Sequence, residues 1–158
     1  NSSSSQPLKI SSSANPIPTM RNIEFRIMSR DIFPIQYPLC IAIIGTKIKD
    51  NKNIKLINKK PLISYTIKQA KKSKLFDKIV VSTDSKNIQK CAQKFGAESW
   101  FLRPKKLASD QSQKVPVIQH TLRESEKYFK KKFDIIIDLD ASSPLRNIQD
   151  IKKALVFF

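Results

Sequence analysis

The chain has 158 residues, a formal net charge of +17, two cysteines and two glycines. This length suits one domain with a hydrophobic core, and two cysteines are too few for a disulfide framework or a thiolate metal site, which favours a reducing, cytoplasmic location. No apolar run approaches the ~20 residues of a membrane span, the N-terminus lacks the pattern of a secretory signal, and the scarcity of glycine argues against a glycine-rich phosphate loop.

Residues 1–38 differ from the rest of the chain. They contain two serine runs and five prolines, and no helical or strand period extends across them. Such a composition buries too little apolar surface to order itself. We therefore predict a disordered or loosely ordered extension over 1–38, in which the alternating residues 23–28 are a candidate short strand, followed by a domain over 39–158.

From residue 39 onward, apolar strand patterns alternate with amphipathic helix patterns. Strands are predicted at 39–44, 54–57, 78–82, 99–102 and 133–139. Helices are predicted to begin at Pro61, at Val115 and after the N-caps Ser85 and Asn147, with Gly96 at a helix C-terminus. This order predicts an α/β fold of three layers, with a mostly parallel sheet and helices on both faces. Ligands of such sheets bind at the carboxyl ends of the strands, where the loops 45–53, 82–85 and 138–146 should meet.

The loop after the first strand, residues 45–53, is rich in lysine. Backbone N–H groups and lysine charges at this position suit a phosphate group. The loop is neither a Walker A loop nor a dinucleotide fingerprint, because the required glycines are absent. An ordinary solvated lysine loop is the alternative.

Two carboxylates, Asp138 and Asp140, follow the last predicted strand. Side chains two residues apart in an extended segment point the same way, and paired carboxylates facing phosphates suit Mg²⁺. The alternative is that only Asp140 faces the cleft. The single histidine, His120, fits a packing role better than that of a base, and no serine or cysteine hydrolase is indicated.

The positive charge indicates either an anionic partner or a composition biased toward lysine. The lysines occur in scattered pairs and one triplet, 130–132, without the interleaved aromatic residues that base stacking requires. We therefore expect neither a nucleic-acid nor a membrane partner.

Residues 39–158 resemble the N-terminal part of the acylneuraminate cytidylyltransferases, also called CMP-sialic acid synthetases. The family opens with a loop of the type IIPARGGSKGIPxKN, where this chain has Ile43 and Ile44 followed by GTKIKDNKN. Further similar segments follow in family order at 53–67, 75–85, 94–98 and 101–112. The segment FDIIIDLDASSPLRNIQDI, residues 133–151, resembles the family segment that usually ends in QPTSPLR.

The resemblance implies a Rossmann-like fold of the nucleotide-diphospho-sugar transferase type, here incomplete. It implies an enzyme that joins CTP to a nine-carbon acidic sugar, such as sialic or legionaminic acid, to give a CMP-sugar and pyrophosphate. The nucleotide contacts that it implies are Thr46, Lys47, Lys52, Asn53 and Arg103. It also implies catalytic roles for Lys52 and Asp140, and sugar contacts from Asp140, Ser143 and Arg146. Mg²⁺ is the cofactor expected from the family, and Asp138 and Asp140 are the candidate ligands within this chain.

Several family features are absent from this sequence. The Pro-Ala-Arg-Gly stretch is missing, and with it the arginine that clamps the phosphates; Ile48 and Asn51 replace flexible loop glycines, and Lys114 stands where a family serine contacts the base. The family's main Mg²⁺ ligands and its dimerising segment would lie beyond Phe158, so we do not expect the family's homodimer. We expect weak or lost activity; the alternative is a non-catalytic nucleotide- or polyanion-binding remnant.

Overall fold

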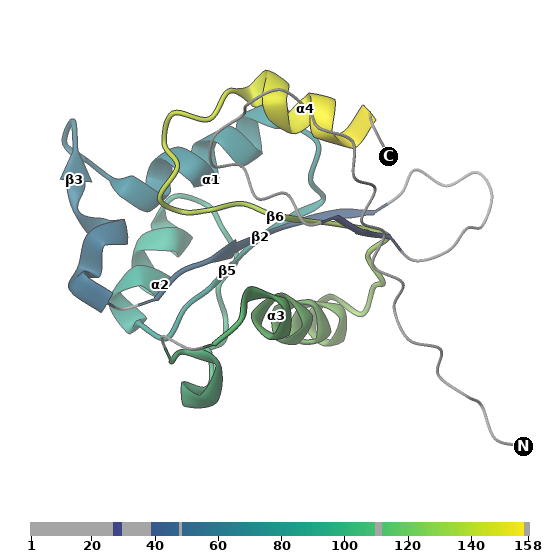
Figure 1. The fold of residues 1–158 in the computed structure, drawn as a ribbon, viewed down its shortest axis with the longest axis horizontal. Coiled ribbons are helices and arrows are strands. Elements are labelled where there is room, and N and C mark those ends of the chain that lie inside the picture. The colour runs from purple at the N-terminus through teal and green to yellow at the C-terminus, as the bar shows by residue number, and fades with distance from the viewer. Residues whose placement is uncertain (1–26, 30–38, 48, 110–111, 157–158) are drawn as a thin grey trace, which may run out of the picture.

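The computed structural model describes residues 27–29, 39–47, 49–109 and 112–156. Its centre is a four-stranded sheet of order β1-β6-β2-β5 (Figure 1). Strands β2 (Cys40–Gly45), β5 (Lys78–Ser82) and β6 (Ile135–Asp138) are parallel, and β1 (Ile27–Ser29) pairs antiparallel with β6. A separate two-stranded ribbon joins β3 (Leu56–Ile57) to β4 (Lys60–Pro61). The predicted α/β fold with a mostly parallel sheet is confirmed.

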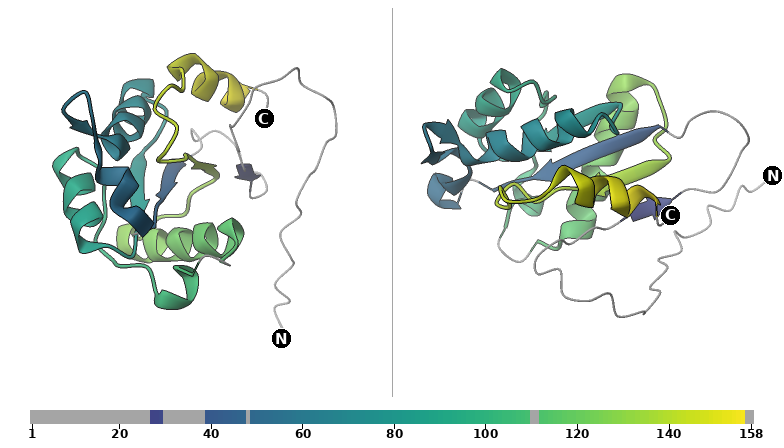
Figure 2. Two further views of the ribbon diagram at one scale, coloured as in Figure 1. Left: turned by 60° about the vertical axis from the view of Figure 1, so that its left-hand side comes forward. Right: turned by 90° about the horizontal axis from the view of Figure 1, so that it is seen from above.

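Helices cover both faces of this sheet. Helices α1 (Leu62–Ser73), α2 (Lys86–Lys94) and α4 (Ile148–Val156) lie on one side, and α3 (Lys114–Phe129) lies on the other (Figures 1 and 2). Strand β2 is buried because it contributes to both layers: Ala42 and Ile44 pack toward α1 and α2, whereas Ile41 and Ile43 pack toward α3. The central strand therefore has no polar face, as its continuous apolar sequence predicts.

Helix starts and stops follow the predicted local signals. The N-cap of α1 is Pro61, and Ser85 caps α2 by accepting a hydrogen bond from the Ile88 N–H at 3.5 Å. The Asn147 side-chain oxygen accepts the Gln149 N–H at 3.0 Å just before α4. Gly96, which follows α2, has a φ of +85°, a conformation that glycine adopts without steric cost.

Two sequence predictions about regular structure are wrong. Residues 99–102 form no strand; only Glu98 makes an isolated bridge to Val80. Trp100 and Phe101 instead pack beside α3, while the chain stays next to the end of β5, where the Arg103 N–H donates to the Thr83 carbonyl. Of the predicted strand 54–57 only β3 forms, because Ile54 is the last residue of a 3₁₀ helix, η1 (Lys49–Ile54), that begins in the loop 45–53; a second short 3₁₀ helix, η2 (Lys105–Leu107), precedes α3.

Of the predicted extension over 1–38, the structure describes only the three residues of β1, which belong to the sheet. Residues 1–26 and 30–38 lie outside the described part of the chain. Among the helices that the structure describes, none combines the length and the apolar character needed to cross a bilayer.

Candidate functional site

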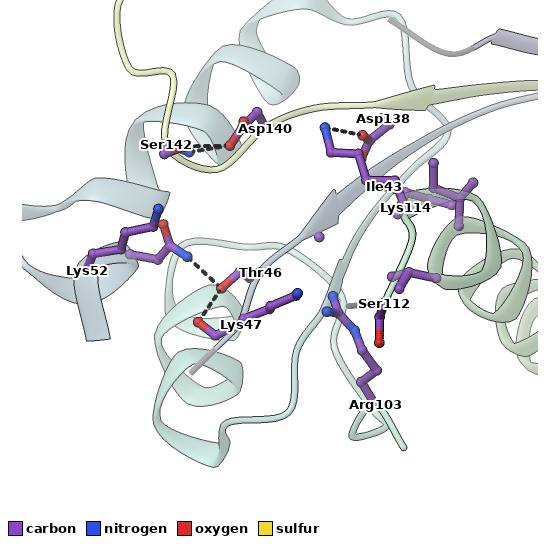
Figure 3. A pocket seen from close by; sticks show the side chains of 14 residues that line it. Ile43, Thr46, Lys47, Lys52, Arg103, Ser112, Lys114, Asp138, Asp140 and Ser142 are labelled. Carbon is purple, nitrogen blue, oxygen red and sulfur yellow. Dashed lines mark hydrogen bonds and ion pairs between the residues drawn. The ribbon is translucent and has the colours of Figure 1, made fainter. Parts of the chain in front are cut away.

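A cavity of about 350 Å³ opens at the carboxyl ends of β2 and β6 (Figure 3). Its walls come from four separate segments: the loop after β2, Arg103, the start of α3, and the segment after β6. Ile43 and the α3 residues Val117 and Ile118 give it apolar surface. The cavity therefore lies where the parallel topology predicts a ligand site.

The loop after β2 is held at both ends by buried hydrogen bonds. The Thr46 N–H donates to the Ser82 carbonyl at 3.0 Å, and the Asn53 side-chain amide donates to the Thr46 hydroxyl at 2.8 Å. Asn51 takes a left-handed φ of +48°, which asparagine tolerates better than most residues. These contacts place Thr46, Lys52 and Asn53 along one wall, and the buried Asn53 Oδ1 has no hydrogen-bond partner among the described residues.

Lys47 reaches across the cavity mouth from the same loop. Its ammonium group donates to the Ser109 carbonyl at 2.7 Å, which connects the loop after β2 with the segment that precedes α3. Ser109 itself does not line the cavity, but Ser112 of the same segment does, so this contact holds that segment close to the loop after β2.

Arg103 forms the opposite wall and is buried, with 5% of its surface exposed. Its Nε donates to the Ser82 hydroxyl at 3.2 Å and its Nη2 to the Ser82 carbonyl at 2.5 Å. Burial lowers the pKa of the guanidinium, and the charges of Asp84 and Asp138 act in the opposite direction. Strand β5 therefore fixes the orientation of this cation through its last residue.

Asp138 and Asp140 both line the cavity, as their spacing predicts (Figure 3). Asp138 is buried and its Oδ2 lies 3.3 Å from the Lys114 ammonium group, whereas Asp140 is exposed. The Asp140 Oδ1 accepts hydrogen bonds from the Ser142 N–H at 2.8 Å and the Ser142 hydroxyl at 2.7 Å. Partial burial acts to raise the pKa of Asp140, but these two bonds and the charges of Lys114 and Arg146 outweigh it and lower the pKa.

The cavity combines four cationic side chains with two carboxylates. The cations are Lys47, Lys52, Arg103 and Lys114, and they come from three segments of the chain, because Lys47 and Lys52 share the loop after β2. A concave site with excess positive charge attracts anions such as a polyphosphate, and the carboxylates add oxygen donors on the wall formed after β6.

Two predicted sugar contacts lie outside this cavity. Ser143 is half-buried and is not among the lining residues, and Arg146 is buried behind the 140–146 segment. The Arg146 Nη2 donates to the Asp140 carbonyl at 3.2 Å. The Gln69 side-chain amide of α1 also donates to this segment, to the Pro144 carbonyl at 2.7 Å. In this structure Arg146 therefore supports the backbone of the segment, because its side chain bonds to the carbonyl of Asp140.

Sequence reasoning missed Ser112 and Ser142 as lining residues. Ser142 had a local signal, because an aspartate commonly accepts a hydrogen bond from the backbone two residues later. Ser112 had no such local signal, because only the packing of α3 against β2 brings the segment before that helix to the cavity. The ion pair between Lys114 and Asp138 was likewise not predictable, because 24 residues separate the partners in the sequence.

The protein-family model that matches this chain is named cytidylyltransferase and covers residues 47–156. Post-translational flagellin modification protein B of Campylobacter coli is 54% identical over 114 residues, which are 72% of this chain and 48% of that protein. CMP-N,N'-diacetyllegionaminic acid synthase of Campylobacter jejuni is 53% identical over 100 residues, which are 63% of this chain and 43% of that protein. The chain thus spans less than half the length of these curated relatives.

Solved structures support the same fold. CMP:2-keto-3-deoxy-manno-octonic acid synthetase complexed with CTP matches 75% of this chain and 46% of its own, with a TM-score of 0.59 and 20% identity. A cytidylyltransferase from Leptospira borgpetersenii matches 77% of this chain and 49% of its own, with a TM-score of 0.59 and 19% identity. The family model extends over more than half of the residues, and it agrees with the relatives and with the motifs in the sequence. The chain therefore belongs to the cytidylyltransferase family.

Proposed function

We propose that this chain is the nucleotide-binding part of an enzyme that joins CTP to a nine-carbon acidic sugar of the sialic or legionaminic acid type, giving a CMP-sugar and pyrophosphate. The observation that carries the proposal is the cavity that Lys52, Arg103 and Asp140 line together from three different segments of the chain. The family and the names of the relatives supply the substrate class. The free thiols of Cys40 and Cys91 suit a cytoplasmic reaction.

In the proposed reaction the anomeric hydroxyl oxygen of the sugar attacks the α-phosphorus of CTP. The bond from that phosphorus to the bridging oxygen breaks, pyrophosphate leaves with the electron pair, and the hydroxyl proton is released. Such transfers depend mainly on positioning and on charge stabilisation. Lys47 and Lys52 would balance the phosphate charge, Arg103 would bind the nucleotide from the opposite wall, and Asp140 would contact the sugar.

We propose that Mg²⁺ accompanies the nucleotide. The ion is usually held by one or two carboxylates together with substrate phosphates, and Asp138 and Asp140 offer carboxylates in the same cavity. Within the described residues, no group of three or more His, Cys, Asp or Glu could hold a metal ion. The two carboxylates therefore fit an ion that is shared with the phosphates and that would neutralise part of their negative charge.

We further propose that turnover is weak. The loop over residues 45–53 contains no arginine, and loss of one transition-state charge contact costs about 10²–10³ in rate. Lys47 is the nearest replacement, but its ammonium group is engaged by the Ser109 carbonyl. Binding of the nucleotide is therefore expected to be better preserved than its reaction.

The test is calorimetric titration of the full chain with CTP and with ATP in the presence of Mg²⁺, at two salt concentrations. We expect saturable binding of CTP that is at least fivefold tighter than that of ATP. Lys52→Ala should weaken CTP binding about five- to tenfold, as loss of a charge-assisted contact does. The matched control is Lys55→Ala, because Lys55 is exposed and lies outside the cavity.

Equal and steeply salt-dependent binding of CTP and ATP would instead support a general polyanion-binding protein. Pyrophosphate release from CTP is then assayed with N,N'-diacetyllegionaminic acid and with N-acetylneuraminic acid. We expect rates below the ~1 s⁻¹ lower end of typical enzymes. A rate within the typical range for either sugar would contradict the proposal of weak turnover and support the reaction itself.

A further inference from the structure

A second cavity, of about 620 Å³, shares no lining residue with the first. It is bounded by β4, by α1 and by the segment that enters α4, on the side of the sheet where α1 and α4 lie (Figure 1). Four of its lining residues are cationic: Lys60, Lys68, Lys72 and Arg146. Among the described residues, no aspartate or glutamate lines it. Burial lowers the pKa of Arg146, and the charges of Asp140, Asp138 and Asp150, which lie nearby but outside the lining, act in the opposite direction.

Arg146 is the buried member of this set, with 9% of its surface exposed. Its Nη2 donates to the Asp140 carbonyl, whereas its Nε and Nη1 have no hydrogen-bond partner among the described residues. The nearby carboxylates are engaged elsewhere: Asp150 accepts from the Asn147 N–H at 3.2 Å, and Asp140 accepts from Ser142. A buried donor without an acceptor typically costs about 1–3 kcal/mol, which indicates that an acceptor is missing from this site.

The start of α4 contributes to the same cavity. Asn147 and Ile148 line it, and they form the N-terminus of a nine-residue helix. The Asn147 N–H donates to Asp150 and the Gln149 N–H donates to the Asn147 side chain, so this helix end favours an anion mainly through the helix dipole. Lys60 and Lys72 are exposed and supply further charge, whereas the Lys68 ammonium group lies over the Phe95 ring, 5.6 Å from its centroid.

We propose that this second cavity binds a small phosphate anion, inorganic phosphate or pyrophosphate, with Arg146 as the central contact and with Lys60 and Lys72 beside it. A guanidinium group matches phosphate oxygens with paired donors, and lysines add flexible charge. The site is separate from the nucleotide cavity, and it does not depend on the proposed reaction.

The test is an amide-resolved NMR titration of the full chain with sodium pyrophosphate and, separately, with sodium phosphate. We expect saturable shifts at Tyr65, Gln69 and Asn147, distinct from any shifts at Thr46 and Lys52 that report the first cavity. The paired variant Lys60→Gln/Lys72→Gln should weaken binding at the second cavity at least fivefold. Its matched control is Lys130→Gln/Lys131→Gln, which removes the same charge from exposed residues at the end of α3 and should change the affinity less than twofold.

Arg146→Lys should weaken binding at the second cavity by a similar factor while the dispersion of the spectrum shows a folded chain. If that variant does not fold, the paired lysine variant decides. The proposal is overturned if no saturable shifts occur at the second cavity, if both paired variants bind as the parent does, or if both lose affinity equally, which would indicate general charge screening. Equal affinity for sodium citrate would overturn the assignment to phosphate. Shifts confined to the second cavity would support it even if the nucleotide proposal failed.

Discussion

Arg103 connects the first cavity to the sheet, because its two hydrogen bonds to Ser82 hold the end of β5. Arg103→Lys keeps the positive charge. The ammonium group of lysine, however, cannot make both of the hydrogen bonds that the guanidinium group makes to Ser82. We expect it to lower the free energy of unfolding by about 1–3 kcal/mol, the usual cost of leaving a buried polar group unpaired. Urea denaturation followed by circular dichroism measures this change.

Arg123→Lys is the matched control for that prediction, because Arg123 is exposed on α3. Exposed substitutions usually change stability by less than about 0.5 kcal/mol. If both variants unfold at the same urea concentration as the parent, the bonds from Arg103 to Ser82 contribute nothing to stability and the prediction is wrong.

The contribution of the Asp140 carboxylate to the stability of the folded chain should depend on pH, and the hydrogen bonds from Ser142 should influence that dependence. The pKa of Asp140 in the folded chain lies below its ordinary value of 3.8, so its ionised form stabilises the folded state above that value. This contribution is lost as the pH falls through the folded pKa. Ser142→Ala removes the hydroxyl hydrogen bond and should raise the pKa of Asp140, measured by carboxyl ¹³C chemical shift against pH.

Ser143→Ala provides the comparison for this titration, since no hydrogen bond from Ser143 to Asp140 is observed. It should leave the titration of Asp140 unchanged. An identical pKa of Asp140 in the parent and in Ser142→Ala would show that the hydroxyl does not stabilise the carboxylate.

At the scale of elements, two helices end on lysines in a left-handed conformation. Lys74 follows α1 with a φ of +57°, and Lys130 follows α3 with a φ of +52°. Glycine adopts this conformation without the clash between Cβ and the backbone. Lys74→Gly and Lys130→Gly should each raise the free energy of unfolding by about 0.5–1 kcal/mol, because relief of this strain exceeds the entropic cost of glycine.

Lys131→Gly is the control, because Lys131 is exposed and does not have a positive φ. It should stabilise nothing and should cost a few tenths of a kcal/mol through the greater freedom of the unfolded chain. Stabilisation of equal size in all three variants, measured by urea denaturation, would point to relief of charge repulsion rather than of backbone strain.

At the scale of the whole molecule, the net charge is +17, so the positively charged side chains of the folded chain repel one another and destabilise it. Raising sodium chloride from about 20 mM to about 500 mM shortens the Debye length to a few ångströms and should raise the thermal midpoint by a few degrees. Lys130→Glu/Lys131→Glu reduces the net charge to +13 and should show a smaller rise. A midpoint that does not depend on salt would show that the charges are too widely spaced to matter.

The arrangement of elements was largely predictable because it depends on local patterns. The apolar run of β2 has polar segments on both sides, Ser85 and Gly96 mark the two ends of α2, and each signal acts within a few residues. Residues 99–102 have the composition of a strand but form none, because Trp100 and Phe101 pack against α3 instead of joining the ladder. Such competition between packing partners is decided by distant residues.

The family, the mostly parallel α/β fold and the carboxyl edge of the sheet as the place of the cavity were all predictable, because strands, helices and motifs follow one another along the chain in a recognisable order. Which neighbouring residues share a cavity depends instead on how the chain folds in three dimensions. Asp140 lines the first cavity whereas Arg146, six residues later, lines the second, because the intervening segment turns over α1. The pairing of Lys114 with Asp138 likewise required the packing of α3 beneath β2, which no local pattern specifies.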